Sequence, residues 1–347
     1  KKMSNYFKVE NIRNCSVKKL CSLNMPIEEA EVLVDSMLAA DMSGISTHGI
    51  RMLPSYIEKI RRKDFSFGTP EIKKQTAAFT VIDAKNIVGA VSATYAQNIA
   101  VDKAFLSGIH TVFSKNSNTF GPAFYYVEKI AEKGMIGFTC CNSPAAMPAY
   151  NGLEVMLGTN PLAFAAPSKT CGNIVIDMAT SVVAKSRFGV AKENGEKLQP
   201  GWALDKDGNP TIDPEEAMKG FILPMAGFKG YGIALIIDIL SGLLSGAGYL
   251  NNVGKFYSDC GAPMNVGHMI VAINPDIVYD GDFAAELDSY ITKLRNSKKM
   301  TGKEIVIPGD RRAKIIKRSS VSGIELPEEI VKKLEIIFGE KLKVATL

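Results

Sequence analysis

The sequence contains few of the features that mark disulfide-bonded, metal-binding or membrane-spanning proteins. Its six cysteines, Cys260 included, form no Cys-x-x-Cys pair, and no His/Cys/Asp cluster has zinc spacing. We therefore expect no metal centre, no disulfide framework and a reducing, cytoplasmic location. Residues 1–6 lack the apolar core of a secretory signal. The one long apolar run, residues 233–250, contains Asp238 and several glycines, so it predicts a buried helix and no membrane contact.

The chain also lacks a strong excess of one charge. It has 41 Lys and Arg against 36 Asp and Glu, a net charge of +5 over 347 residues. Two denser basic runs, residues 59–63 and 311–318, have no interleaved aromatic residues. They predict solvated faces rather than a nucleic-acid interface. A modest positive field still favours small anionic substrates.

Neither of the common nucleotide-binding motifs is present. No Gly-x-Gly-x-x-Gly follows a predicted strand, and no Gly-x-x-x-x-Gly-Lys-Ser/Thr occurs anywhere. The glycine pairs at residues 230–232 and 246–248 both lack the third glycine. The sequence thus gives no support to an ordinary Rossmann or P-loop site.

Histidine is scarce, with three residues in the whole chain. His110 and His268 begin apolar strands, and we expect both to be packed or surface residues. His48 lies in the polar stretch Thr47-His48-Gly49, and Arg51 follows closely. Histidine exchanges protons near neutral pH, and a guanidinium pairs well with a carboxylate. This stretch therefore predicts an acid/base histidine beside an anion-binding arginine.

Hydrophobic periodicity predicts an α/β organisation. The first sixty residues are expected to be helical, and strands and helices alternate from residue 77. Strands are predicted at 77–82, 109–113, 135–141, 162–166, 174–176, 268–273 and 305–307. Helices are predicted at 26–40, 50–60, 88–106, 120–133, from about 231, at 283–294 and at 327–338. We expect a central sheet domain over 76–309, with a helical N-terminal part (1–75) joined by C-terminal residues 310–347.

Small and polar residues gather at further stretches, namely 116–121, 142–144, 158–161, 177–181 and 227–232. Taken singly, each is also ordinary turn sequence. Asp177 or Thr180 is expected to cap the N-terminus of a helix, a position that also receives phosphate. Lys229, between glycines, is either a solvated turn lysine or an ammonium group presented to a ligand.

In their order along the chain, these stretches resemble the malate/L-lactate dehydrogenase family, whose NAD(P)-binding fold is not of the Rossmann type. The most specific matches are DMSGISTHG at 41–49, LGTNP at 157–161, IDMATS at 176–181 and FKGYG at 228–232. The resemblance implies an α/β fold with a central sheet domain and helical ends. It also implies NAD- or NADP-dependent interconversion of a small 2-oxo acid and its 2-hydroxy acid by a homodimer.

The resemblance implies site residues as well. His48, with Thr47 and Arg51, would act in catalysis. Asn142, Ser143 and Thr159 would lie near the substrate. The implied cofactor contacts are Thr119, Phe120, Gly121, Asp177, Met178, Ala179, Thr180, Ser181, Phe228, Lys229, Gly309 and Asp310.

Two positions depart from the family pattern. Thr119 stands where the family usually has a histidine, and Met52 where it usually has an arginine, with Arg51 one residue earlier. One residue on an α-helix rotates a side chain by about 100°, which would turn Arg51 away from the cleft unless the turn has another shape. Two alternatives therefore stay open: a cyclic-imine acid reductase or an atypical NAD-using enzyme of this family, and a non-catalytic NAD-binding homologue.

Overall fold

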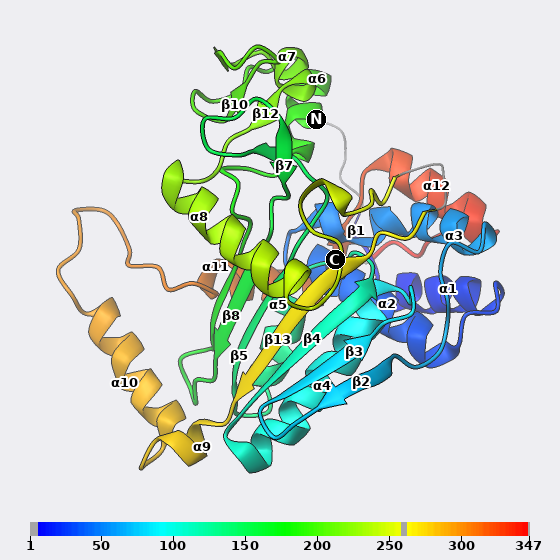
Figure 1. Ribbon diagram of the computed structural model, residues 1–347. Coiled ribbons are helices and arrows are strands. Elements are labelled where there is room, and N and C mark those ends of the chain that lie inside the picture. Colours follow the sequence, from blue (N-terminus) through cyan, green and yellow to red (C-terminus); the bar gives the residue numbers. More distant parts are fainter. Residues whose placement is uncertain (1–5, 258–261, 346–347) are drawn as a thin grey trace.

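The computed structural model describes residues 6–257 and 262–345, and a seven-stranded mixed sheet forms its centre (Figure 1). The strand order is β2-β3-β4-β13-β5-β8-β9. Within this sheet β3 and β4 are parallel, and the other neighbouring strands are antiparallel. The strands are Glu71–Gln75 (β2), Phe79–Asp83 (β3), Ile109–Ser117 (β4), Ile136–Cys141 (β5), Leu162–Ala166 (β8), Ile174–Met178 (β9) and Val266–Ile273 (β13).

One face of the sheet carries the main core. Because successive strand residues point to opposite faces, His110, Val112 and Ser114 of β4 all point inward, and all three are fully buried. Helices α4 (Gly89–Ser107) and α5 (Phe124–Ala131) cover this face. The buried face of α4 consists largely of alanines, whose small side chains let the helix lie close to the strands.

The opposite face is crossed by α8 (Phe228–Ile237), which continues into a π-helical segment, η3 (Asp238–Leu243). Ile237 packs there against Cys140 and Met269 of the sheet. The buried helix expected in this region is buried on one side only, since Leu243 is 56% exposed. None of the helices in the described ranges is both long enough and apolar enough to cross a membrane.

The two ends of the chain pack together in a helical layer beside α4 and α5. Strands β1 (Tyr6–Phe7) and β14 (Ile324–Glu325) pair antiparallel. Helix α12 contacts α1 and α3, and α11 contacts α2. As a result, the C-terminal end of α2 lies close to the start of α11. The helices are Val9–Cys21 (α1), Ile27–Met42 (α2), Leu53–Arg61 (α3), Asp310–Ser322 (α11) and Glu328–Phe338 (α12).

A small lobe with its own core stands beyond the end of the sheet (Figure 1). Phe188 of α6 is fully buried in this lobe against Met147, Leu157 and Ile222. At the start of α7, the Asp213 carboxylate accepts hydrogen bonds from the first turn of the helix. The elements are Met147–Pro148 (β6), Val155–Leu157 (β7), Ser186–Asn194 (α6), Ala203–Leu204 (β10), Pro210–Thr211 (β11), Pro214–Lys219 (α7) and Phe221–Ile222 (β12).

Two sequence-based expectations about elements are wrong. Residues 305–307 form no strand, because Ile307 leads directly into α11 and donates its N–H to Asp310 at the start of that helix. Residues 71–75, placed in the helical part, form the edge strand β2. The remaining helices are Pro275–Val278 (α9) and Phe283–Arg295 (α10), with 3₁₀ turns at Ser46–His48 (η1), Ile50–Met52 (η2) and Leu250–Asn252 (η4). Cys260 and residues 1–5 lie outside the described residues.

Candidate active site

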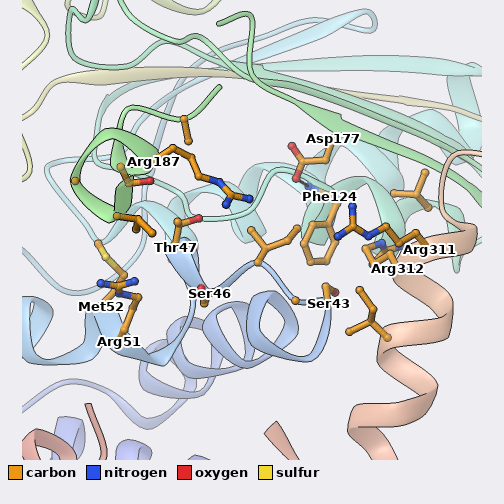
Figure 2. Close-up of a pocket in the computed structure, with 18 of the residues that line it drawn as sticks. Ser43, Ser46, Thr47, Arg51, Met52, Phe124, Asp177, Arg187, Arg311 and Arg312 are labelled. Carbon is orange, nitrogen blue, oxygen red and sulfur yellow. Dashed lines mark hydrogen bonds between the residues drawn. The ribbon is translucent and has the colours of Figure 1, made fainter. Parts of the chain in front are cut away.

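A cavity of about 850 Å³ opens between the turn that follows α2, strand β9, helix α6 and the start of α11. Four of the predicted site residues line it, namely Thr47, Arg51, Asp177 and Gly309. Figure 2 shows Thr47 and Arg187 towards one end, and Asp177, Phe124 and two arginines of α11 towards the other. The fold thus brings both ends of the chain to one cavity.

His48 lies in a smaller recess beside this cavity. The recess is lined by His48, Tyr56 and the turn 119–121, and Met52 lines both spaces. The predicted acid/base histidine and one predicted cofactor turn therefore meet. The His48 side chain is open to the recess, while the protein around it displaces much of its water and lowers its pKa below the ordinary value.

The turn that carries His48 is not α-helical, and this decides where Arg51 points. Residues 46–48 and 50–52 form two 3₁₀ turns with an extended Gly49 between them, and α3 begins only at Leu53. The path is tighter than an α-helix, and Arg51 and Met52 both line the cavity. The turn therefore has the other shape that the sequence left open, and Arg51 is not directed away from the cavity.

The cavity is rich in positive charge. The guanidinium groups of Arg51, Arg187 and Arg311 line it and form no ion pair with any described residue. Arg312 differs, because it pairs with Glu128 at 2.6 Å and stacks 4.4 Å from the centre of the Phe124 ring. Unpaired guanidinium groups at a concave surface attract carboxylates and phosphates.

Asp177 is the predicted cofactor residue with the clearest structural role. It lies at the end of β9, so the expectation that it caps a following helix is wrong. Its carboxylate instead accepts the N–H of Phe124 at 2.9 Å and so caps α5. Burial raises the pKa of Asp177 to about 6, against the opposing effects of the Phe124 hydrogen bond and the Arg312 charge.

The residues after Asp177 are held by bonds inside the protein. The hydroxyl of Thr180 donates to the carbonyl of Thr159 at 3.0 Å, and the hydroxyl of Ser181 donates to Val183 at 2.8 Å. No helix begins here, because residues 179–185 follow an irregular path between β9 and α6. Met178 is partly exposed, at 38%.

The predicted substrate residues do not line the cavity. Asn142 is fully buried, and its amide holds two backbone groups, the carbonyl of Gly248 at 2.6 Å and the N–H of Gly267 at 2.9 Å. The Ser143 hydroxyl is buried and has no hydrogen-bond partner among the described residues. Asn142 therefore supports the loops around the sheet instead of presenting an amide to the cavity.

Phe228 and Lys229 follow the segment 223–225, whose backbone is hydrogen-bonded to Thr180 and Val182. Both are exposed at the start of α8, and neither lines the cavity. The Phe228 ring contacts Tyr150 and Tyr231, with ring centres 5.5 and 6.2 Å apart. The predicted cofactor residues therefore lie at three places, namely the cavity (Asp177 and Gly309), the recess with His48 (119–121) and the exposed start of α8 (Phe228 and Lys229).

The start of α11 holds one predicted site residue that lines the cavity, Gly309, and one lining residue that the motifs do not predict, Arg311. Gly309 has a φ of +110°, and a Cβ there would lie 2.9 Å from the carbonyl oxygen of Asn173. Asp310 pairs with Arg295 at 2.8 Å and faces its own helix start. Arg311, interpreted from sequence as part of a solvated basic run, lines the cavity. Tyr257 also lines the cavity, and no local motif predicts this.

The chain matches known proteins over nearly its whole length. The family model described as malate/L-lactate dehydrogenase covers residues 7–335. The malate/(S)-sulfolactate dehydrogenase of Methanothermus fervidus is 36% identical over 95% of this chain and 96% of its own. The solved structure of the sulfolactate dehydrogenase of Methanocaldococcus jannaschii superposes with a TM-score of 0.90 at 32% identity, covering 97% of this chain and 98% of that one.

A further relative names its cofactor. The ureidoglycolate dehydrogenase (NAD(+)) of Escherichia coli O157:H7 is 31% identical over 94% of this chain and 93% of its own. These matches agree with the mixed α/β architecture, and the family model covers the stretches around His48 and Asp177. The chain belongs to the malate/L-lactate dehydrogenase family.

Proposed function

We propose that this chain uses His48 to transfer the proton in the interconversion of a small 2-oxo acid and its 2-hydroxy acid. The chain is an NAD(P)-dependent oxidoreductase of its family, acting on the CH–OH group. The observation that carries the assignment of His48 is its place in a recess with the turn 119–121, next to a cavity lined by unpaired arginines.

The cavity suits NAD or NADP. Its volume is about 850 Å³, and its unpaired guanidinium groups match the charge of a pyrophosphate. At Gly309 the backbone approaches the neighbouring strand so closely that a Cβ would collide. Asp177, Gly309 and Arg311 would hold the dinucleotide, which supplies or accepts a hydride when bound. With one parallel strand pair in the sheet and no glycine fingerprint, this site is proposed to be of a non-Rossmann type, within the central domain 76–309.

The protein's part in the reaction is proton transfer and orientation. As the 2-oxo acid is reduced, charge develops on its carbonyl oxygen, and the imidazolium of His48 donates a proton to that oxygen. Arg51 pairs with the substrate carboxylate and so fixes its orientation. In the oxidation direction neutral His48 accepts the proton from the hydroxyl group. Thr119 can donate a hydrogen bond but does not exchange protons near neutral pH.

The test is a screen of the purified protein with NADH and NADPH against a panel of 2-oxo acids and cyclic imine acids. The panel includes the oxo acids of malate, lactate, sulfolactate and ureidoglycolate. We expect saturable turnover of at least one 2-oxo acid. Turnover of cyclic imines alone would assign the imine reductase function instead. Saturable cofactor binding without any turnover would indicate a non-catalytic homologue.

We also propose that the protein is a cytoplasmic homodimer, joined through the outer face of the sheet. Phe113 and Val271 on that face are only half-buried, and Ile236, Ile239 and Leu243 beside them are at least half exposed. Such a contiguous apolar surface usually marks an interface. Light scattering should give twice the monomer mass for the wild type and the monomer mass for Ile239→Glu.

The control for this test is Ile336→Glu on α12, which removes an even more exposed isoleucine far from the outer sheet face. It should remain a dimer. A monomeric wild-type protein at micromolar concentration would overturn the proposed assembly.

A further inference from the structure

The carboxylate of Asp41 lies against the backbone that directly follows His48. Asp41 belongs to the last turn of α2, and its Oδ2 accepts the N–H of Ile50 at 2.6 Å. Ile50 begins η2, the 3₁₀ turn that also contains Arg51. A single carboxylate thus ties the end of one helix to the segment between His48 and Arg51.

Gly49 fits this contact closely. A Cβ on Gly49 would lie 1.9 Å from Oδ1 of Asp41 and 2.3 Å from its Cγ. The backbone of Gly49 is extended, with φ −84° and ψ −165°, a conformation that alanine also adopts. The lack of a side chain at this position is therefore required by the Asp41 carboxylate and not by the backbone.

An ordinary helix cap would explain the hydrogen bond to Ile50 alone. It does not explain a carboxyl group in this surrounding, where burial raises the pKa of Asp41 to about 7 while the Ile50 hydrogen bond and the nearby Arg51 oppose the rise. Burial of a carboxylate costs free energy unless it gains partners. Here the partners are the turn N–H and the charge of Arg51, which both belong to the substrate-facing segment.

We propose that Asp41 is a positioning residue, which holds the imidazole of His48 and the guanidinium of Arg51 in place through the backbone of Gly49 and Ile50. The inference rests on the proposed role of His48 in proton transfer. In this role Asp41 touches neither substrate nor cofactor. Because a side chain at position 49 would collide with the Asp41 carboxylate, the effects of substitutions at Asp41 and Gly49 should depend on each other.

The test is a double-mutant cycle with Asp41→Ala, Gly49→Ala and the double variant. Each single variant should lower kcat about 10- to 100-fold, since small displacements of catalytic groups cost factors of this size. The double variant should be no worse than the poorer single variant, because removal of the carboxylate makes room for the new methyl group. Asp41→Asn keeps an acceptor for Ile50 and should recover most of the lost activity.

A second readout separates positioning from a purely structural role. The protein has three histidines, so the His48 ring signals can be assigned by NMR with the His48→Gln variant. Asp41→Ala should shift or broaden the His48 signals and leave those of His110 and His268 unchanged. The control Asp35→Ala removes another carboxylate of α2, one that pairs with Arg13 at 2.6 Å, and should lower stability without changing the His48 signals or kcat.

A wild-type kcat together with unchanged His48 signals in Asp41→Ala would overturn the proposal. A kcat of the double variant reduced by the product of the two single reductions would overturn it as well. If the wild-type protein turns over no substrate, the proposed function fails. The NMR comparison and the coupling between Asp41 and Gly49 in thermal unfolding would then still decide the positioning role by themselves.

Discussion

The three histidines of this chain have very different surroundings. The ring of His110 is bonded to Thr80 and to the carbonyl of Ala77, at 2.9 and 3.0 Å. His268 is fully buried and donates from Nε2 to the carbonyl of Asn118 at 3.1 Å, and burial lowers its pKa to about 4. His48 has no hydrogen-bond partner among the described residues and faces a recess. It is therefore the histidine free to exchange a proton with a ligand.

The lowered pKa of His48 sets the pH dependence of the reaction. A histidine whose pKa lies below its ordinary value is neutral at pH 7 and becomes an imidazolium only at lower pH. We expect kcat/KM for reduction to rise as the pH falls towards and below 6.5, and kcat/KM for oxidation to fall over the same range. Initial rates in both directions from pH 5 to 8.5 measure this. A profile that keeps its shape in His48→Gln would contradict the assignment.

Arg51 should affect substrate binding more than chemistry. Loss of a charge-assisted pair costs about 1.5–3 kcal/mol, so Arg51→Ala should raise the KM for the oxo acid about 10- to 100-fold and change kcat less. Arg61→Ala is the matched control, because Arg61 is exposed on α3 outside the cavity. If both variants have the same KM, Arg51 does not bind the substrate.

At the level of elements, Asp177 connects strand β9 to the start of α5. Its folded-state pKa of about 6 lies above its ordinary value, so the folded protein binds this proton more tightly than the unfolded chain. The stability that the folded protein gains from the tighter binding of this proton is therefore fully present at low pH, and it is lost as the pH rises from about 4 to about 6. Asp177→Asn should flatten the change in Tm over this interval relative to wild type.

Calorimetric melting curves at several pH values check this prediction. Asn retains an oxygen that can accept the Phe124 N–H, so the variant should lose little stability at pH 7. A drop in Tm at pH 7 as large as that of Asp177→Ala would show that the charge itself holds α5.

The bounds of strands and helices are predictable from sequence where local signals specify them. Strand β8 and helix α10 were expected close to their observed bounds, because hydrophobic period and caps specify them locally. The 3₁₀ path of the turn after α2 was not, since it depends on short-range backbone hydrogen bonds and on the Asp41 carboxylate, which accepts the N–H of Ile50. The strand expected at 305–307 does not form for a related reason. The N–H of Ile307 donates its hydrogen bond to the Asp310 carboxylate and not to a neighbouring strand.

At the scale of the whole molecule, the site exists because the two ends of the chain meet. The turn after α2 and the start of α11 line one cavity, although the lining residues 43–52 and 309–315 are far apart in the sequence. Sequence motifs identified Thr47, Asp177 and Gly309 by resemblance, yet no local pattern predicted that Arg311 would join them. Contacts between distant segments depend on packing that single-sequence patterns do not encode.

A site shared by both ends of the chain should also make global stability depend on the cofactor. A ligand at 100 times its Kd stabilises the folded state by about 2.7 kcal/mol, so NADH or NADPH should raise Tm measurably. Arg311→Ala should reduce that shift, whereas Arg318→Ala on the same helix but outside the cavity should not. Equal shifts in both variants would place the dinucleotide elsewhere.

The central claim is that His48 transfers the proton, and steady-state kinetics of His48→Ala with the best substrate of the panel test it most directly. General acid/base groups contribute about 10²- to 10⁴-fold to rates. We predict a loss of kcat in this range, with NAD(P)H binding by fluorescence titration unchanged. A variant that binds cofactor normally and retains kcat within about twofold of wild type would contradict the account.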